Sequence, residues 1–265
     1  MKKLLFFLIT VIFFTMNSLA FAQLKLDKYQ EKLEIIQGKT LNGFIVVENA
    51  STEQVTVKTS VDDIVMLPPF DGNREFRPAG STAYSFADWL TLSPEIFIIP
   101  ALGKQKVSYA IDVPEDAKGG YYGTIFFEKV ETAATTGVGV AFRIGSTISL
   151  ITKDAVRDIK IEDVSLTGNG IKGQFLNSGN VILNSDYVYN LMDGKGKIAD
   201  RGKSLKSFVL PPGEKFPFEI NLNKKVKEGS YSLVINFNLA SGGGLSGEVE
   251  LAKDKSGNLQ IVKVK

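Results

Sequence analysis

The sequence predicts an all-β protein made of two tandem immunoglobulin-like β-sandwich domains. Short runs alternate apolar and polar residues with a period of two, and β-branched and aromatic residues dominate them. Turn-forming residues separate these runs, and no window of helical length repeats its apolar residues every 3.6 positions. At 265 residues the chain is too long for one ordinary sandwich and fits two domains.

Residues 1–22 are expected to be a cleaved signal peptide. Lys2 and Lys3 precede an apolar run over 4–16, and 20–22 (Ala-Phe-Ala) place small residues at the two positions that a signal peptidase reads. A retained membrane anchor is the alternative, but the apolar run is shorter than the roughly 20 residues that span a bilayer. We therefore expect an exported protein without a transmembrane anchor; the periplasm is the favoured location, and the cell surface and secretion are the alternatives.

The expected strands form two groups. The first group is 33–35, 44–47, 55–57, 107–113 and 122–127, and the second is 159–161, 187–191, 216–222 and 231–237. Turns are expected at 71–73, 119–120, 169–170, 193–194 and 256–258, where Gly stands beside Asp, Asn, Ser or another Gly. Charged residues interrupt the apolar pattern near 152–156, so we place the first domain at 23–152 and the second at 153–265.

An internal repeat links the two groups. The segment 97–100 (FIIP) corresponds to 208–211 (FVLP), 47–51 to 175–179, Gly103 to Gly213, and Tyr122 to Tyr231. We interpret this as one sandwich pattern used twice, with a Tyr at a strand corner. Such a Tyr can bury its ring and hydrogen-bond the backbone through its hydroxyl.

The residues that are missing exclude much chemistry. The chain has no His and no Cys, which rules out disulfides, Cys nucleophiles, Ser-His-Asp triads and His/Cys metal sites. Asp62, Asp63 and the 71–73 turn offer oxygens for calcium, but Asp-Gly-Asn is typical of a plain turn. We expect a protein that is not an enzyme and that has no cofactor and no metal.

Charge also limits the partners. Without residues 1–22, which carry two Lys and no acid, the chain has 29 basic and 29 acidic residues. This balance gives no long-range attraction to nucleic acid or anionic lipid, so neither is an expected partner.

The stretch 65–89 is the longest one without clear alternation, and long loops in compact domains are often functional. It concentrates aromatic and Arg side chains, the types that dominate binding hot spots. The candidate partner-binding residues are Phe70, Arg74, Phe76, Arg77 and Tyr84. The alternative is that the rings of this stretch, above all Phe86 and Trp89, fold back and cap the open end of the sandwich.

A motif in the first half points to a family. Asn49, Trp89, 97–103 (Phe-x-x-Pro-x-x-Gly), an alternating strand over 107–111 and 113–123 (Val-Pro-Glu-Asp-Ala-Lys-Gly-Gly-Tyr-Tyr-Gly) follow one another. Residues 31–152 thereby resemble the first domain of the WxL-interacting family of Gram-positive surface proteins. They are also similar to the immunoglobulin-like periplasmic pilus-assembly chaperone superfamily, whereas the second half resembles generic fibronectin- or CARDB-like modules.

The resemblance implies a non-enzymatic protein-binding module, with chaperone-like handling of surface or pilus-type subunits. The expected partner is another exported or surface protein. The alternative is a cell-surface adhesion protein, or a structural protein that binds peptidoglycan or another glycan. In pilus chaperones two basic residues grip the carboxylate at the subunit's C-terminus, but the positions that match them here are Glu34 and Gly145. A carboxylate-gripping pair is therefore not expected at those positions.

The strand 137–144 alternates apolar residues with Gly and Arg. In the chaperone interpretation it is a sheet edge that pairs with a partner strand through Val138, Val140, Phe142 and Ile144. The alternative is that it is simply the last strand of the first domain, paired internally.

Overall fold

The computed structural model describes residues 24–130, 142–223 and 225–265, so the expected signal peptide lies outside the described residues. Within these ranges the chain is almost entirely β-sheet, and its helical content is one 3₁₀ turn, η1 (Ala87–Trp89). None of the described residues form a helix with the length and hydrophobicity that crossing a bilayer requires. The prediction of an all-β fold with two sandwich domains is confirmed.

The first domain packs a four-stranded sheet on a six-stranded one. The four-stranded sheet, here the β3 sheet, has the order β1 (Leu24–Leu26), β3 (Thr40–Asn49), β8 (Lys104–Asp112), β6 (Leu90–Ser93). The other, here the β10 sheet, has the order β2 (Gln30–Ile35), β10 (Arg143–Thr152), β9 (Gly120–Lys129), β4 (Val55–Met66), β5 (Arg74–Pro78), and β7 (Ile96–Ile99) also pairs with β4. Within these two sheets only β2 and β10 are parallel.

The second domain packs a three-stranded sheet on a six-stranded one. The smaller sheet has the order β11 (Ile159–Leu166), β12 (Gly170–Asn177), β16 (Lys215–Asn221). The larger sheet has the order β14 (Ile198–Lys203), β13 (Leu183–Asp193), β17 (Gly229–Leu239), β18 (Gly244–Lys253), β19 (Leu259–Val264), and β15 (Phe208–Leu210) also pairs with β13.

Period-two alternation produces the two cores. In β8, for example, Val107, Tyr109 and Ile111 are buried while the residues between them are more exposed. Each domain has its own cluster of buried apolar side chains. Burying one large apolar side chain contributes roughly 1.5–3 kcal/mol, so cores of this size can stabilise a chain that lacks disulfides.

Two buried asparagines confirm the internal repeat. Asn49 ends β3, and its Nδ2 donates to the carbonyl oxygens of Ile99 (3.2 Å) and Pro100 (3.0 Å). Asn177 ends β12, and its Nδ2 donates to the carbonyl oxygen of Leu210 at 2.8 Å. In each domain a carboxamide therefore ties the end of one strand to the end of the strand that precedes the Pro-containing turn.

The predicted correspondence between Tyr122 and Tyr231 is wrong by one residue. Tyr231 lies in the second core and its hydroxyl donates to the carbonyl oxygen of Lys227 at 2.9 Å. The tyrosine that corresponds to Tyr231 in the first domain is Tyr121. It packs against the first core, and its hydroxyl accepts from the Lys118 amide at 3.1 Å. Because successive residues of a strand face opposite sides, Tyr122 lies on the outer face of the β10 sheet.

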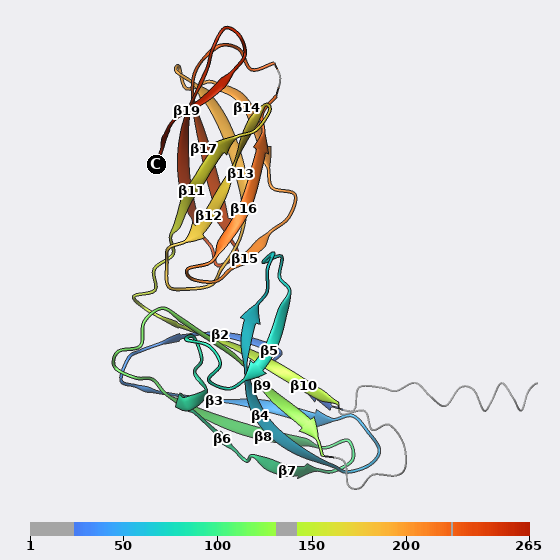
Figure 1. Cartoon of the computed structure of the whole chain (residues 1–265). Coiled ribbons are helices and arrows are strands. Elements are labelled where there is room, and N and C mark those ends of the chain that lie inside the picture. The colour runs from blue at the N-terminus through green and yellow to red at the C-terminus, as the bar shows by residue number, and fades with distance from the viewer. Residues whose placement is uncertain (1–23, 131–141, 224) are drawn as a thin grey trace, which may run out of the picture.

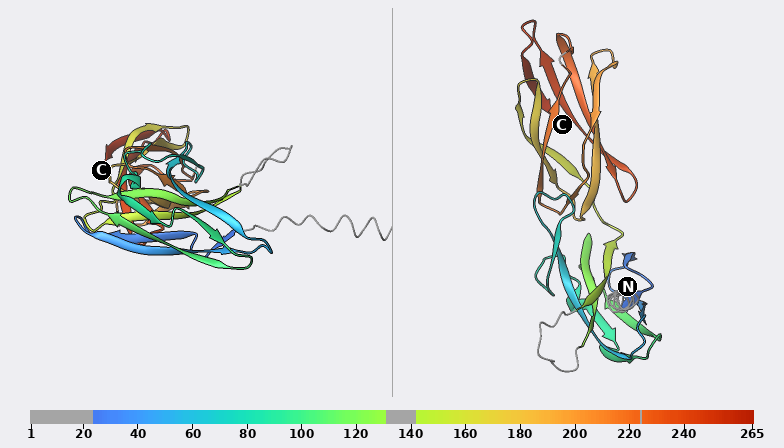
Figure 2. Two further views of the ribbon diagram at one scale, coloured as in Figure 1. Left: turned by 90° about the horizontal axis from the view of Figure 1, so that it is seen from below. Right: turned by 90° about the vertical axis from the view of Figure 1, so that its right-hand side faces the viewer.

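The two domains are joined end to side. Figures 1 and 2 show that their long axes are not aligned and that the β4–β5 hairpin of the first domain reaches β15 of the second. The last strand of the first sandwich ends at Thr152 and the first strand of the second begins at Ile159. The hairpin and the short connection between these strands enclose the candidate site.

Candidate functional site

The strand β10 has an open edge near its N-terminal end. On one side β9 pairs with β10 from Arg143 to Ile151. On the other side β2 pairs only with the segment 147–152. Among the described residues, no strand pairs with 143–146 on that second side. An unpaired strand edge is a template for the addition of another strand.

The direction of the backbone groups identifies which residues face the opening. The Thr147 amide donates to the Tyr29 carbonyl oxygen at 3.0 Å, on the same side of β10 as β2. Backbone groups point to alternate sides along a strand, so the N–H and C=O groups of Arg143 and Gly145 also point to that side. These two residues therefore offer the hydrogen-bonding groups that an added strand would use.

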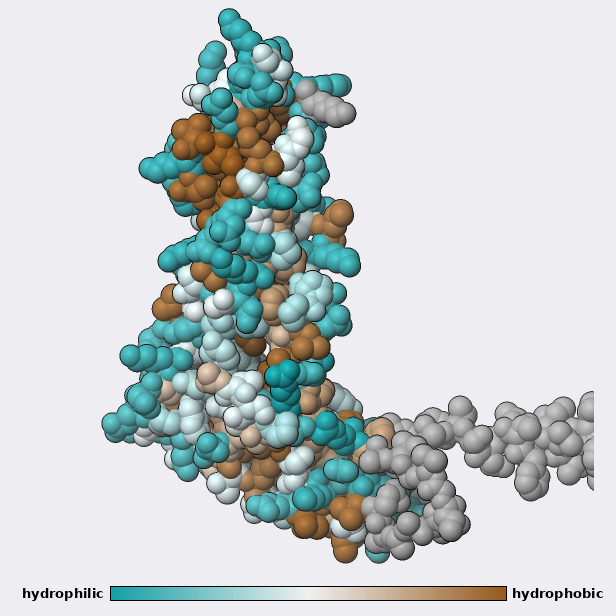
Figure 3. Space-filling model, viewed as in Figure 1, coloured by the Kyte–Doolittle hydropathy of each residue, from teal (hydrophilic) through white to brown (hydrophobic). Residues whose placement is uncertain are grey.

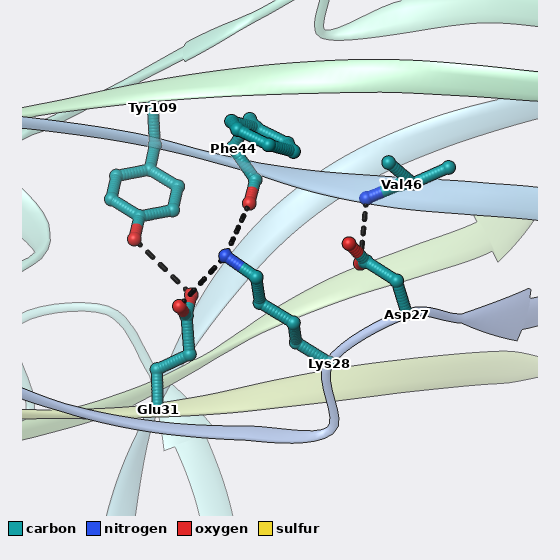
Figure 4. Close-up of polar contacts among 6 residues, drawn as sticks. All are labelled: Asp27, Lys28, Glu31, Phe44, Val46 and Tyr109. Carbon is teal, nitrogen blue, oxygen red and sulfur yellow. Dashed lines mark hydrogen bonds and ion pairs between the residues drawn. The ribbon is translucent and has the colours of Figure 1, made fainter.

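Side-chain contacts fix the place where the edge opens (Figure 4). The chain crosses from the β3 sheet to the β10 sheet between β1 and β2, and Asp27 Oδ1 accepts from the Val46 amide at 2.8 Å. Glu31 then accepts from Lys28 Nζ at 2.9 Å and from the Tyr109 hydroxyl at 3.1 Å. These contacts hold β2 to the β3 sheet, so they set how far along β10 the strand β2 can pair.

A cleft of about 310 Å³ lies between the domains, beside the C-terminal half of β10. The outer face of the β10 sheet lines one wall, and the segments 181–184 and 239–241 of the second domain line the other. Lys32, Arg74 and Arg157 contribute cationic groups, and none of the described residues that line the cleft is Asp or Glu. The cleft therefore has the charge to hold an anion.

The two positions that the resemblance indicated for a basic pair lie outside the cleft. Glu34 is exposed and lies 3.8 Å from Lys153, and it does not line the cleft. Gly145 lies against Phe126, outside the cleft. Lys32 is two residues before Glu34 on the same face of β2, and that face lines the cleft. The cations are present, but at positions other than the two that the resemblance indicated.

The stretch 65–89 is not one long loop. Residues 74–78 form β5, which pairs with β4 in an antiparallel hairpin. No apolar alternation marks these residues because β5 is an exposed edge strand, with only Glu75 partly buried. Beyond β5, Phe86 is buried in the first core and Trp89 packs against it, as the capping alternative expects.

Phe70 is not at a free surface. It lies at the hairpin tip, is 5% exposed, and belongs to the core cluster of the second domain. Its carbonyl oxygen accepts from the Val209 amide at 2.7 Å. Phe70 therefore contacts the neighbouring domain and is not accessible to a partner in this conformation.

An aromatic and arginine cluster lies on the outer face of the β10 sheet. The rings of Phe76 and Phe126 meet edge to face, with centroids 4.9 Å apart. The Arg143 guanidinium lies 3.9 Å from the Phe126 centroid and pairs with Asp62 at 2.8 Å, and Arg74 lies 5.9 Å from the Phe76 centroid. This cluster extends from Arg143 at the open edge of β10 to Arg74, which lines the cleft.

The other candidates are distributed as follows. Arg77 pairs with Glu75 on the exposed hairpin and does not line the cleft. Tyr84 is half-buried, and burial raises the pKa of its hydroxyl. Phe142 is 39% exposed at the start of the open edge, and Ile144 packs partly on the first core. Val138 and Val140 lie outside the described residues.

The carboxylates considered for calcium have protein partners. Asp63 is buried and accepts from the Thr82 amide at 2.8 Å and from the Ser85 hydroxyl at 2.6 Å. Asp71 accepts from the Asn73 amide at 3.3 Å inside the hairpin turn. In the portion of the chain that the structure describes, no group of three or more metal-ligating side chains occurs.

Exposed apolar residues gather away from the cleft. Ile96 and Ile98 on β7 are 62% and 57% exposed, and Figure 3 shows brown, apolar residues at that end of the first domain. A larger apolar area lies on the second domain in the same view. Nothing in the structure identifies what covers either area.

The architecture has known counterparts. No protein-family model matches the sequence, and no characterised relative matches it at the sequence level. The crystal structure of the class 5 fimbriae chaperone CfaA matches with a TM-score of 0.59 and 17% identity, covering 85% of this chain and 98% of that chain. The fold is that of the fimbrial chaperones. A chain from a chaperone–tip adhesin complex of CFA/I fimbriae biogenesis has a TM-score of 0.58 and 16% identity, covering 92% of this chain and 100% of that chain.

These matches confirm the fold that the resemblance to the pilus-assembly chaperone superfamily implies. The similarity to the WxL-interacting family stays a prediction. Both matched chains are covered almost completely, so the likeness includes both domains.

Sequence reasoning missed Lys32, Arg157 and Tyr122 as residues of the cleft. Lys32 could have been identified from the sequence, because it lies two residues before Glu34 and residues two apart on a strand share a face. Arg157 lies in the connection between the domains, where no periodicity indicates a direction. Tyr122 could be placed only once the register of β9 was known.

Proposed function

We propose that this protein is an exported, non-enzymatic assembly chaperone that pairs the open edge of β10 with a strand of a surface or pilus-type subunit. The single observation that carries the proposal is the unpaired edge at 143–146 next to a cleft lined by cations. An added strand gains main-chain hydrogen bonds from Arg143 and Gly145.

The geometry also gives the direction of the partner strand. The cleft lies toward the C-terminal end of β10, beyond the point where β2 begins to pair. A partner strand that places its C-terminal carboxylate near Lys32 must therefore run parallel to β10. Lys32, Arg74 and Arg157 would hold that carboxylate by charge-assisted hydrogen bonds.

The side chains support the same assignment. Phe142 presents a large apolar surface at the start of the open edge, and such surface is costly to expose unless it is used. Chaperone-like work needs no catalytic group, and it fits a chain without His or Cys. The expected signal peptide and the fold together favour the periplasm as the site of action.

The test is co-expression with exported subunits whose reading frames adjoin that of this protein, followed by native mass measurement. We expect a one-to-one complex with the unaltered chain. Phe142→Asp and Lys32→Glu each weaken it on the order of tenfold or more, because one removes the apolar contact and the other opposes the carboxylate. Val262→Asp, at a 62% exposed apolar position of β19, is the matched control.

Two outcomes contradict the proposal. One is a complex that forms equally well with Phe142→Asp, with Lys32→Glu and with the control. The other is the absence of any protein partner combined with retention of this chain on washed cell wall at high salt, which supports the adhesion alternative. Extending the subunit by two residues at its C-terminus tests the carboxylate separately and is expected to weaken the complex.

A further inference from the structure

The tip of the β4–β5 hairpin behaves as part of the second domain. Among the described residues, Phe70 is the only buried residue of the first domain that belongs to the second core cluster. Met66 also packs against that cluster. The tip is internally ordered, because the Leu67 amide donates to the Asn73 carbonyl oxygen at 2.9 Å and the Phe70 amide to the Leu67 carbonyl oxygen at 2.8 Å. The hairpin is therefore ordered up to its tip, where the apolar ring of Phe70 enters the second core.

A second contact joins the domains on the other side of the cleft. The Gly120 amide donates to the Asn180 carbonyl oxygen at 3.0 Å, and the Ile182 amide donates to the Tyr122 hydroxyl at 2.8 Å. Gly119 has φ +83°, and a Cβ built there would lie 2.2 Å from the Asn180 carbonyl oxygen. No side chain fits at Gly119, because the backbones of the two domains lie so close together there. This contact is therefore a second point at which the domains are attached.

The cleft lies between these two contacts. Met66, Gly72 and Arg74 of the hairpin line it, and so do Tyr122 and Val209. Any hinge motion that widens the cleft must withdraw Phe70 from the second core or break the contact at Tyr122. The position of Arg74, four residues after Phe70, depends on the same hairpin.

We infer that Phe70 is a positioning residue, which locks the angle between the domains and holds Arg74 at the cleft. The functional meaning of this lock rests on the proposed function, in which the cleft receives the end of a partner chain. With the lock in place the cleft is formed before the partner arrives, so binding does not have to order the two domains.

The test measures the angle directly and needs no partner. The chain has no Cys, so Ser108→Cys and Ser256→Cys, both at exposed positions, allow one spin label in each domain. Pulsed electron paramagnetic resonance then gives the distribution of distances between the labels. We expect a single narrow distribution for the unaltered chain and at least a doubled width for Phe70→Ala.

The matched control is Phe76→Ala, which removes an aromatic ring from the same hairpin but from outside the second core. It is expected to keep the narrow distribution, and so is Lys32→Glu. An amide NMR spectrum shows whether both domains are folded. A narrow distribution for Phe70→Ala with both domains folded would overturn the inference, because the side chain would then only fill the second core.

If Phe70→Ala does not fold, Phe70→Val takes its place, with the same two outcomes. A loss of thermal stability alone does not count, because truncation of any buried ring causes it. Since no partner is present, these distances are independent of the proposed function. A broad distribution for Phe70→Ala and normal subunit binding by Lys32→Glu would uphold the lock and refute the role of the cleft.

Discussion

The hydroxyl of Tyr122, on β9 of the first domain, accepts a hydrogen bond from the amide of Ile182 in the second domain at 2.8 Å. Burial raises the pKa of this hydroxyl to about 12, although the hydrogen bond from Ile182 opposes the shift. The neutral phenol is therefore part of the contact that fixes the cleft.

This contact predicts how stability changes at alkaline pH. The folded pKa of Tyr122 exceeds the unfolded value near 10, so the folded state binds more protons. Stability is therefore full below about pH 10 and falls as the pH rises toward 12. Burial, and then Glu31, also raise the pKa of Tyr109, which adds to this loss. Urea unfolding between pH 7 and 11 measures it.

The variant Tyr122→Phe separates the two tyrosines. At pH 7 it lowers the free energy of unfolding by about 1 kcal/mol, because the Ile182 amide loses its partner. Above pH 10 its stability falls less steeply than that of the unaltered chain. An equally steep decline in the variant would show that Tyr122 does not titrate with unfolding.

Asn177 is expected to be a major contributor to the stability of the second domain. Its Nδ2 donates to the carbonyl oxygens of Val181 and Leu210, both at 2.8 Å, and its Oδ1 accepts from the Gly179 amide at 3.0 Å. Asn177→Ala leaves buried groups unpaired and lowers the free energy of unfolding by about 3 kcal/mol. The control, Asn236→Ala at a half-buried strand position, should change it by less than about 1 kcal/mol. Similar losses for both variants in urea unfolding would contradict this role.

Gly145 is expected to tolerate no side chain. A Cβ there would lie 2.5 Å from Thr124 Cγ2 and 2.9 Å from Phe126 Cε1. Gly145→Ala therefore destabilises the first domain by about 1–3 kcal/mol through overpacking. Gly168→Ala is the control, because no atom lies within 4 Å of the Cβ it would add. Equal thermal midpoints for the two variants would mean that the outer face of β9 and β10 is loosely packed.

Glu31 is expected to control the length of the open edge. Glu31→Ala removes the acceptor of Lys28 and Tyr109, so β2 is held less firmly against β10. The Thr147 amide, which donates to Tyr29 at the start of this pairing, should then exchange its hydrogen several times faster. The control is Glu34→Ala, whose carboxylate is exposed. Unchanged exchange at Thr147 in Glu31→Ala would assign the pairing to the backbone alone.

Local pattern was enough to predict several of the strands that pack on a core, but it missed others, such as the edge strands β5 and β19, and it did not give the pairing of the strands. The alternation in 107–113 and 231–237 reports a half-buried strand, and the structure places both in sheets that pack on a core. The shared Asn of 47–51 and 175–179 was found because its environment recurs in each domain. Pairing depends on contacts far apart in sequence, which no short window contains.

The errors concern register and contacts between domains. A shift of one residue exchanged Tyr121 for Tyr122, and one residue is enough to reverse the face of a strand. Phe70 follows two prolines in a stretch without alternation, so nothing local indicates that it enters another domain's core. Lys32 was missed because the resemblance pointed to Glu34, which lies two residues later on β2 and does not line the cleft.

Amide hydrogen exchange at β10, with and without a bound subunit, tests the central claim most directly. In the free protein we expect the amides of Arg143 and Gly145, which point to the open edge, to exchange fast. The amides of Ile144 and Ser146, which point to β9, should exchange slowly and serve as internal controls. Binding should slow Arg143 and Gly145 alone. Slow exchange at these two amides in the free protein, or no change on binding, would contradict the account.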